Sequence, residues 1–392
     1  MNIILFDDER EAFLPLSYTR PISYFRVGIF TIKEKWEKYY QNISVKTEEY
    51  LSKKYVLKKR DDNIWINSRL IPNESIITEI NNLRIGELLE KDSTILAYRS
   101  KTYYQKKLNK INSNADFSFL HSITDIFKLN GTEIKNDFLT ISKGKKTSWQ
   151  GELENHQNSN TKFGDYPIYI EKGAKIHNSS LDTTQGPIYI GKDTEIMQGS
   201  LIKGPFAMCN NSVLKMGAKI YESTTIGPFC KVGGEVNNSV FFGYSSKAHD
   251  GFLGNSVIGE WCNLGADTNN SNLKNNYENV KIWNYQTNSF GDTGLQFCGL
   301  IMGDHSKCGI NTMFNTGTLV GVGANIFGSG FPRSFIASFS WGGSSGFTIH
   351  KLDKFLKTAE KVLKRRKKAF SDNDIDILSH VYDMTKRYRN EK

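Results

Sequence analysis

The chain has 392 residues, which exceeds the usual size of one hydrophobic core, so its length predicts two domains or one long repeat array. Hydrophobic residues make up 38% of it and charged residues 23%, a balance that excludes an intrinsically disordered chain. The net charge of +10 could attract nucleic acid, anionic lipid or a phosphorylated small molecule, but the excess lies in the runs Lys53 to Arg60 and Lys357 to Lys368, beside no nucleic-acid module. We therefore predict solvated helix faces there and no nucleic-acid partner.

The first residues, MNIILFDDER, reach acidic side chains after a short apolar run. This pattern fits neither a signal peptide nor a membrane span, so the sequence predicts a cytoplasmic protein without membrane insertion. The five cysteines form no Cys-x-x-Cys pair, and their odd number favours reduced, mostly buried thiols over a disulfide framework.

Residues 1–150 show no short repeat and predict an α/β domain. They begin with a β-like run from Asn2 to Phe6, continue through Asp7 and Asp8, and reach a helix-like stretch at 25–40. The segment PLSYTRP, Pro15 to Pro21, resembles the Pro-Leu-Thr signature of sugar-phosphate nucleotidyltransferases. That resemblance implies a nucleoside triphosphate substrate. Its phosphates would be bound by Asp8, Arg10, Arg20 and Arg26, and Asp7 or Asp8 would hold Mg²⁺.

The amino-terminal region also departs from that family. The glycine-rich Gly-x-Gly-Thr-Arg loop that would hold nucleotide phosphates is absent, Asp7 to Arg10 stand in its place, and the expected Pro-Lys is missing. A domain of this length is shorter than a usual nucleotidyltransferase. Two interpretations therefore stay open: a reduced nucleotidyltransferase-like domain that is active, and a degenerate domain that serves as a scaffold.

From Ile190 onward the chain repeats every six residues. The step gives eight apolar positions without a failure, and it recurs in two later series: Ile190, Ile196, Ile202, Met208, Leu214, Ile220, Ile226 and Val232; then Phe252, Ile258 and Leu264; then Met302, Cys308, Phe314, Val320 and Ile326. A period of six fits neither a helix nor a simple alternating strand, so each hexad must form a short strand and a corner, three to a coil. The pattern resembles the hexapeptide-repeat acyltransferases and implies a left-handed parallel β-helix over residues 165–345.

Two interruptions break the period, at Asn237 to Asp250 and at Thr268 to Gly299. Loops that leave a rigid solenoid often carry binding residues, so we expect site residues near both. The second interruption is too long for an unstructured loop, and we predict an ordered extension with a short strand near Val280 to Tyr285.

The segment KAHDGFLGNSVIGEWCNLGADTNNSN, residues 247–272, resembles the acetyltransferase half of the bifunctional bacterial enzyme that makes UDP-N-acetylglucosamine. The matching positions are His249, Leu253-Gly254, Ile258-Gly259 and residues 263–266. Together with LFDD and PLSYTRP, the chain resembles Bacteroidetes-type homologues of that enzyme over nearly its full length. The resemblance implies that His249 is the general base that deprotonates the amine of an amino sugar, since imidazole accepts a proton near neutral pH. The alternative is a histidine that merely fills a corner.

The same resemblance assigns the remaining candidates. Substrate-binding positions are Lys231, Phe252 and Asn263, although Phe252 replaces an aromatic hydroxyl of the family and the segment after Lys231 is shorter here. Positions along acetyl-CoA are Ala266, Asn272, Gly309, Gly328 and Arg333. The seven histidines lack the spacing of the metal-binding β-helix relatives, so no metal is predicted in the repeat.

After the repeat, residues 350–392 predict a helical segment. Six apolar residues share one face of a helix over 351–370, with lysines opposite, and we expect this helix to cap the open end of the solenoid: Leu352, Phe355, Leu356, Ala359, Val362 and Leu363.

The resemblance thus implies a homotrimeric transferase that moves an acetyl group from acetyl-CoA to an amino-sugar phosphate such as glucosamine 1-phosphate. Nucleotidyl transfer that makes a UDP- or dTDP-sugar would be coupled to it if the amino-terminal domain is active. Two alternatives remain: a sugar-1-phosphate nucleotidyltransferase with a structural or regulatory β-helix, and a non-catalytic scaffold.

Overall fold

The structure is a computed structural model that describes residues 2–103, 107–143 and 160–389. Contacts divide the chain into two compact units. Unit 1 contains Met1–Phe13, Thr19–Phe25 and Phe30–Ile123, and unit 2 contains Leu14–Tyr18, Arg26–Ile29 and Thr124–Lys392. The predicted domain limit at residue 150 lies outside the described residues.

Unit 1 is an α/β unit around a six-stranded mixed sheet in the order β2-β1-β3-β5-β4-β6. The central strands β1 and β3 are buried along their whole length, because five consecutive positions in each face other layers of the unit. β1 pairs in parallel with β2 and β3, whereas β5 is antiparallel to β3 and β4. The strands are β1 (Asn2–Phe6), β2 (Ser44–Lys46), β3 (Asn63–Asn67), β4 (Glu87–Lys91), β5 (Thr94–Ser100) and β6 (Asn109–Asn112).

The helices of unit 1 are short. They are η1 (Arg10–Phe13), η3 (Ile22–Tyr24), α1 (Ile32–Trp36), α2 (Glu49–Ser52) and α3 (Glu74–Asn81). α1 begins with a capping box between Thr31 and Glu34. The α/β class and the first strand predicted from the sequence are confirmed, and the helix expected over 25–40 is reduced to α1.

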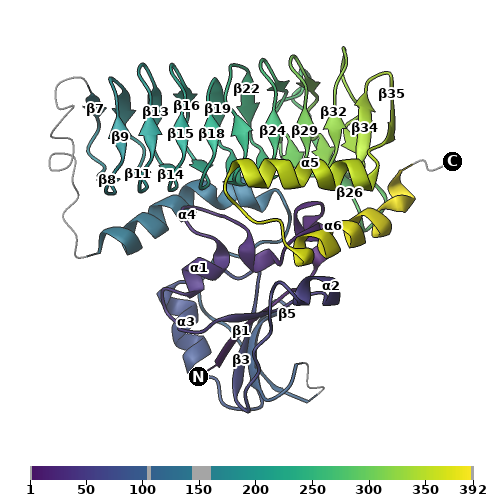
Figure 1. The fold of residues 1–392 in the computed structure, drawn as a ribbon. Helices are drawn as coiled ribbons and strands as arrows, with labels where there is room; N and C mark the ends of the chain where they lie inside the picture. Colours follow the sequence, from purple (N-terminus) through teal and green to yellow (C-terminus); the bar gives the residue numbers. More distant parts are fainter. Residues whose placement is uncertain (1, 104–106, 144–159, 390–392) are drawn as a thin grey trace. The chain divides into compact units, whose positions relative to one another are not determined.

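Unit 2 contains the predicted left-handed parallel β-helix, whose coils stack in Figure 1. Its three faces are three sheets, which we call sheets 1, 2 and 3 in chain order; their strands run parallel except for the last strand of sheet 3. Sheet 1 comprises β7 (Thr161–Phe163), β10 (Ser180–Asp182), β13 (Leu201–Lys203), β16 (Lys219–Ile220), β19 (Glu235–Asn237) and β22 (Phe252–Gly254). Sheet 2 comprises β8 (Ile168–Ile170), β11 (Ile188–Ile190), β14 (Phe206–Met208), β17 (Thr224–Ile226), β20 (Val240–Gly243), β23 (Val257–Glu260), β28 (Ile301–Met302), β31 (Leu319–Val320) and β33 (Phe335–Ile336).

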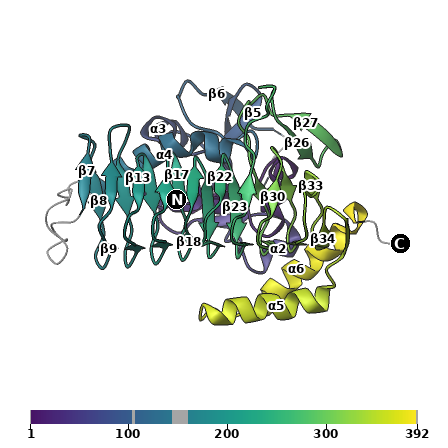
Figure 2. The same cartoon turned by 90° about the horizontal axis from the view of Figure 1, so that it is seen from above.

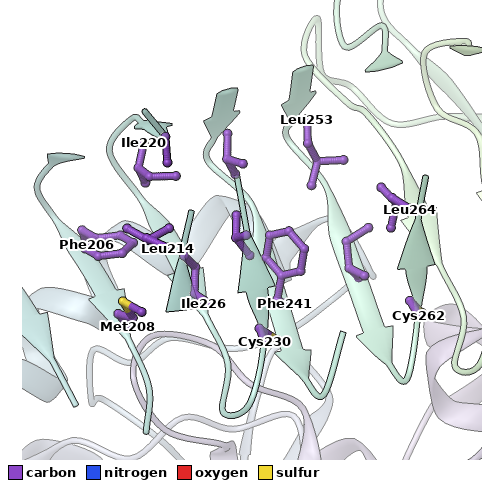
Figure 3. Close-up of a cluster of buried hydrophobic side chains, with 14 of the residues drawn as sticks. Phe206, Met208, Leu214, Ile220, Ile226, Cys230, Phe241, Leu253, Cys262 and Leu264 are labelled. Atoms are coloured by element: carbon purple, nitrogen blue, oxygen red, sulfur yellow. The ribbon is translucent and has the colours of Figure 1, made fainter. Parts of the chain in front are cut away.

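Sheet 3 carries the strands that matter most for the candidate site. It comprises β9 (Lys175–Ile176), β12 (Glu195–Ile196), β15 (Val213–Leu214), β18 (Lys231–Val232), β21 (Ser246–Lys247), β24 (Asn263–Leu264), β29 (Lys307–Cys308), β32 (Asn325–Ile326), β34 (Ser340–Gly343) and β35 (Gly346–Ile349). Apolar side chains recur at the inward positions of the hexads and form a single buried cluster from Ile168 to Ile336. Figure 3 shows part of this cluster, from Phe206 to Leu264. Each such side chain contributes roughly 1.5–3 kcal/mol of hydrophobic stabilisation, repeated in every coil.

The first predicted interruption is not a projecting loop. Residues 237–250 contain β20 and β21 and form part of a short coil: Lys247 occupies the sheet 3 position 15 residues after Val232, whereas Val232 follows Leu214 by 18. The shortening begins at the corner after Val232, where the next inward residue is Val236. In the following coil Leu253, not Phe252, is the inward residue, with 1% of its surface exposed.

The second interruption is an ordered extension, as predicted. It contains β25 (Asn269–Asn270), which pairs with β30 (Met313–Phe314), and an antiparallel hairpin of β26 (Lys281–Asn284) and β27 (Ser289–Asp292). The strand expected near Val280 to Tyr285 is therefore confirmed as β26.

In the described residues of unit 2, three α-helices accompany the β-helix. α4 (Asp125–Ser142) packs on strands β14, β17 and β20 of sheet 2. α5 (Leu352–Arg365) confirms the predicted amphipathic helix and is followed by α6 (Asp372–Met384). The expectation that α5 caps the end of the solenoid is wrong, because it lies along the column (Figures 1 and 2) with Phe355 against His305, Phe339 and His350. The hairpin β34/β35 ends sheet 3 instead.

All five cysteines are buried thiols outside any disulfide, as expected. Burial raises the pKa of Cys230 and Cys298 to about 12, so these thiols stay protonated and unreactive. Among the helices of the described residues, none has the length and apolarity needed to cross a membrane.

Candidate functional site

The main candidate residues lie along one edge of the column, where sheet 3 turns toward sheet 1. We call this the His249 edge; it comprises the residues two positions after each inward residue of sheet 3, namely Asn178, Gln198, Met216, Gly234, His249, Ala266, Ile310 and Gly328. Backbone bonds connect its successive corners: Asp267 N–H donates to Asp250 O at 3.1 Å, and Asn311 N–H donates to Ala266 O at 2.8 Å. The parallel stack thus brings residues from different coils into one row.

His249 follows β21 and is exposed at this edge. The corner before it, Gly233-Gly234, approaches closely: a Cβ on Gly233 would lie 2.8 Å from Ala248 O. An exposed imidazole on a rigid corner is sterically able to meet a ligand that lies along the edge.

Lys231 and Asn263 lie on the outer face of sheet 3, beside the same edge. The register aligns Lys231 with Ser246 and Ser246 with Asn263, so two strand spacings, or about 10 Å, separate their backbones. The structure therefore brings Lys231, His249, Asn263 and Ala266 into neighbouring coils.

Lys231 belongs to a cationic cluster, which we define as Lys215, Lys231, Arg365 and Arg366. Burial lowers the pKa of Lys231, and the positive charges of Arg366, Lys215 and Arg365 lower it further. Within the part of the chain that the structure describes, no ion pair engages these four side chains. The cluster therefore presents an uncompensated positive field beside the His249 edge.

Phe252 and Asn272 take different positions. Phe252 lies on β22 of sheet 1, aligned with Glu235, and its ring covers Gly254, where an added Cβ would lie 2.6 Å away. Asn272 donates from Nδ2 to Asn255 Oδ1 at 2.7 Å, beyond the far end of β22. Phe252 thus borders the coil of His249, whereas Asn272 is not brought to the His249 edge.

The three remaining coenzyme candidates also separate. Gly309 directly precedes Ile310 of the edge, and Gly265 packs so closely on it that an added Cβ would lie 2.4 Å from its carbonyl carbon. Gly328 has φ +103° and open space around its missing side chain. Arg333 lies elsewhere, in the lining of a cavity of about 300 Å³ with Phe335, Phe347, Tyr388 and Arg389.

Lys247 is a candidate residue that the repeat pattern does not indicate. It occupies an inward position of sheet 3 between Val232 and Leu264, with only 1% of its surface exposed. Its ammonium donates to the carbonyls of Gly233, His249 and Gly251 at 2.9, 3.1 and 2.7 Å. Burial lowers its pKa to about 8, opposed by Asp250 and Asp267. The sequence does not reveal this inward position, because steps of six residues from Val232 do not reach residue 247.

The acidic candidates in unit 1 take part in polar networks. Asp7 accepts from the Arg10 guanidinium, from Thr47 Oγ1 at 2.6 Å and from Ile22 N–H at 2.9 Å. Asp8 pairs with Arg69 and accepts from Asn67 Nδ2 at 3.1 Å. In the described residues, no group of three or more His, Cys, Asp or Glu side chains is arranged to hold a metal ion.

The arginine candidates are divided between the two units. Arg20 is buried in unit 1, and its carbonyl accepts from Arg10 at 3.4 Å. Arg26 belongs to unit 2, where its guanidinium donates to Ile29 O and, at 3.3 Å, to Phe242 O of the β-helix. Arg26 is thus directed at backbone carbonyls within unit 2.

Comparison with known proteins gives one family match and several structural similarities. Residues 3–146 match the model of a family described as sugar nucleotidyl transferase. No curated protein sequence matches the chain. Among solved structures, the chain is similar to the polysialic acid-specific acetyltransferase NeuO, with 11% identity over 54% of this chain and 99% of that chain and a TM-score of 0.29.

Two further structures are similar at the same level. AntD, an N-acyltransferase from Bacillus cereus solved with dTDP-4-amino-4,6-dideoxyglucose and coenzyme A, is 10% identical over 55% of this chain and 92% of its own, with a TM-score of 0.21. The Arabidopsis UDP-N-acetylglucosamine acyltransferase is 14% identical over 60% and 84%, with a TM-score of 0.22. Scores of this size carry no argument about this chain, so the fold assignment depends on the sheet register described above.

Proposed function

We propose that the protein is a transferase that moves an acetyl group from acetyl-CoA to the amine of a phosphorylated amino sugar, with His249 as general base. The observation that carries this proposal is the exposed imidazole of His249 on a rigid edge, with Asn263 and Lys231 in the flanking coils. The amine must lose a proton as it attacks the thioester carbonyl, and an imidazole held beside it can accept that proton.

The cationic cluster favours an anionic acceptor. Lys231 lies on the strand that leads into the corner before His249, and the positive charges of Lys215, Arg365 and Arg366 surround it. A phosphate placed there would gain charge-assisted hydrogen bonds while its sugar reaches toward Asn263. A neutral sugar would leave these positive charges uncompensated.

The coenzyme would extend along the His249 edge past Ala266 and Gly309. Two large apolar residues of that edge are strongly exposed in the single chain, Met216 at 69% and Ile310 at 70%. Exposed apolar side chains that flank a polar site favour cover by a ligand or another subunit. We therefore include a homotrimer in the proposal, with acetyl-CoA between neighbouring β-helices.

The test is an acetylation assay with purified full-length protein, acetyl-CoA and a panel of amino-sugar phosphates, in which release of free thiol is followed. His249→Ala should lower kcat by about 10²–10⁴-fold. Gln198→Ala, at the same edge position three coils away, should keep wild-type turnover. Retained turnover in the His249 variant would show that His249 is not the base. A monomer that sediments as such and is fully active would contradict the proposed trimer.

A second candidate function is sugar-1-phosphate nucleotidyl transfer, which the family match over residues 3–146 favours. Release of pyrophosphate from UTP or dTTP in the presence of sugar 1-phosphates and Mg²⁺ would test it. If the activity exists, Asp7→Asn should abolish it and leave acetylation unchanged.

A further inference from the structure

Lys247 is a charged side chain in a column of apolar ones. Its neighbours along the inward face of sheet 3 are Val232 in the preceding coil and Leu264 in the next. A lysine is almost never fully buried unless its ammonium is paired or fully hydrogen-bonded. The position therefore needs an explanation that ordinary packing does not provide.

The ammonium is directed at the corner that carries His249. Two of its three acceptors are the carbonyls of His249 and Gly251, on either side of Asp250, and the third is the carbonyl of Gly233 in the preceding corner. An ammonium has three N–H donors and no acceptor, so these three bonds use its whole capacity. Lys247 therefore has no donor left for a substrate and cannot itself be the base while it is charged.

The short coil explains why this connection is needed. We call the three hydrogen bonds from the Lys247 ammonium to the two corners the Lys247 tie. The corner from Val232 to Val236 has two residues fewer than the corner from Leu214 to Ile220 in the coil before it. The His249 corner therefore stacks on a shortened neighbour that supplies fewer backbone partners. A long side chain reaching from inside the prism connects the two corners through their carbonyls.

We propose that Lys247 is a positioning residue for His249: its ammonium fixes the corner of residues 248–251 and so sets where the imidazole stands. The inference depends on the proposed function only for what the imidazole does. In the enzyme, loss of the tie would let the base drift relative to the amine, and a displacement of about 1 Å costs on the order of 10²-fold in rate.

Two variants separate this role from simple packing. Lys247→Met keeps an unbranched side chain in the column but removes all three donors, and Leu264→Met changes the next inward residue without affecting any donor. We expect Lys247→Met to lower kcat by about 10- to 100-fold while KM for acetyl-CoA changes by less than about twofold. Leu264→Met should retain wild-type kcat. Equal kcat in wild type and Lys247→Met would overturn the inference.

A double-variant cycle compares the kcat of the two single variants with the kcat of the double variant. This comparison distinguishes a residue that acts through His249 from one that only supports the fold. If Lys247 acts through His249, the variant Lys247→Met with His249→Ala should be no slower than His249→Ala alone. Independent, multiplicative losses would contradict the proposal. If Lys247→Met does not fold, Lys247→Arg takes its place: it keeps the charge but replaces the three ammonium donors by a larger, planar guanidinium with five. It should give an intermediate kcat, and an unchanged kcat would count against the proposal.

Hydrogen–deuterium exchange keeps this inference distinguishable from the proposed function. The amides of residues 248–252 should exchange at least about tenfold faster in Lys247→Met than in wild type, while those of sheet 2 stay unchanged. If wild-type protein transfers no acetyl group, the proposed function fails and the exchange result alone decides whether the tie exists. Unchanged exchange at this corner would overturn it.

Discussion

Replacing Lys247 by Met should change how the stability of the protein depends on pH. Burial lowers the pKa of Lys247 from 10.5 to about 8 in the folded protein, with Asp250 and Asp267 opposing the shift. Between pH 8 and 10.5 the unfolded chain therefore binds more protons at this residue than the folded chain. The free energy of unfolding rises with pH wherever the unfolded state binds more protons. The contribution of Lys247 to this free energy is therefore most favourable above pH 10.5, and it is lost as the pH falls through about 8.

The size of this effect follows from the shift. One pKa unit corresponds to 1.36 kcal/mol, so the full window is worth roughly 3 kcal/mol. The free energy of unfolding of wild type minus that of Lys247→Met should therefore grow by roughly 2–3 kcal/mol between pH 7 and pH 10. The difference is the useful quantity, because buried groups such as Tyr189 and Cys230, whose raised pKa values act with the opposite sign, are present in both proteins.

The assay is chemical denaturation of both proteins at four pH values from 7 to 10, followed by far-ultraviolet circular dichroism. Leu264→Met serves as the control, because it changes packing in the same column without removing a titrating group. A difference between wild type and Lys247→Met that stays constant within about 0.5 kcal/mol would refute the reasoning. It would mean that the ammonium is as well solvated by its three carbonyls as by water.

Four other substitutions test separate parts of the structure. Arg366→Met should raise KM for a phosphorylated acceptor several-fold without changing KM for acetyl-CoA, and added salt should weaken acceptor binding less in this variant than in wild type. Gly309→Ala should fold normally, because its added Cβ would make only an ordinary contact, 3.5 Å from Phe327 Cβ, but it should raise KM for acetyl-CoA. Gly265→Ala should lower the melting temperature, because its added Cβ would lie 2.4 Å from the carbonyl carbon of Gly309. Tyr285→Phe should raise the free energy of unfolding by about 1 kcal/mol in denaturation, because the buried hydroxyl has no hydrogen-bond partner in the described residues.

The repeating part of the fold could be predicted because its signal is local. Each inward residue from Ile190 to Val232 lies six positions after the last, and the physical requirement is the same in every coil. The same logic identified β26 and the apolar face of α5. The class of unit 1 followed from an apolar first strand in the same way.

What could not be predicted depends on spacing and tertiary contact. The inward residues after Val232 are separated by four, five and six positions, so a fixed step loses the frame and selects Phe252 instead of Leu253. The apolar face of α5 shows that the helix packs, but its partners come from coils far apart in the sequence. Similarly, nothing in the sequence indicates that Arg26–Ile29 belongs to the β-helix unit.

The place where the period fails is also where the candidate base His249 lies, and the regularity of a solenoid gives a reason for this. Identical coils present identical edges, so a single base in one coil needs a local asymmetry to distinguish it. The short corner at Gly233-Gly234 provides that asymmetry, since it has two residues fewer than the corner before it and lies directly beside the His249 corner. The same shortening removes backbone partners, and the buried ammonium of Lys247 supplies new ones. A lysine would be costly in any regular coil, where an apolar side chain fills the column and every corner has a full neighbour. Its presence in this coil links the irregular spacing, the buried charge and the exposed imidazole as parts of one arrangement.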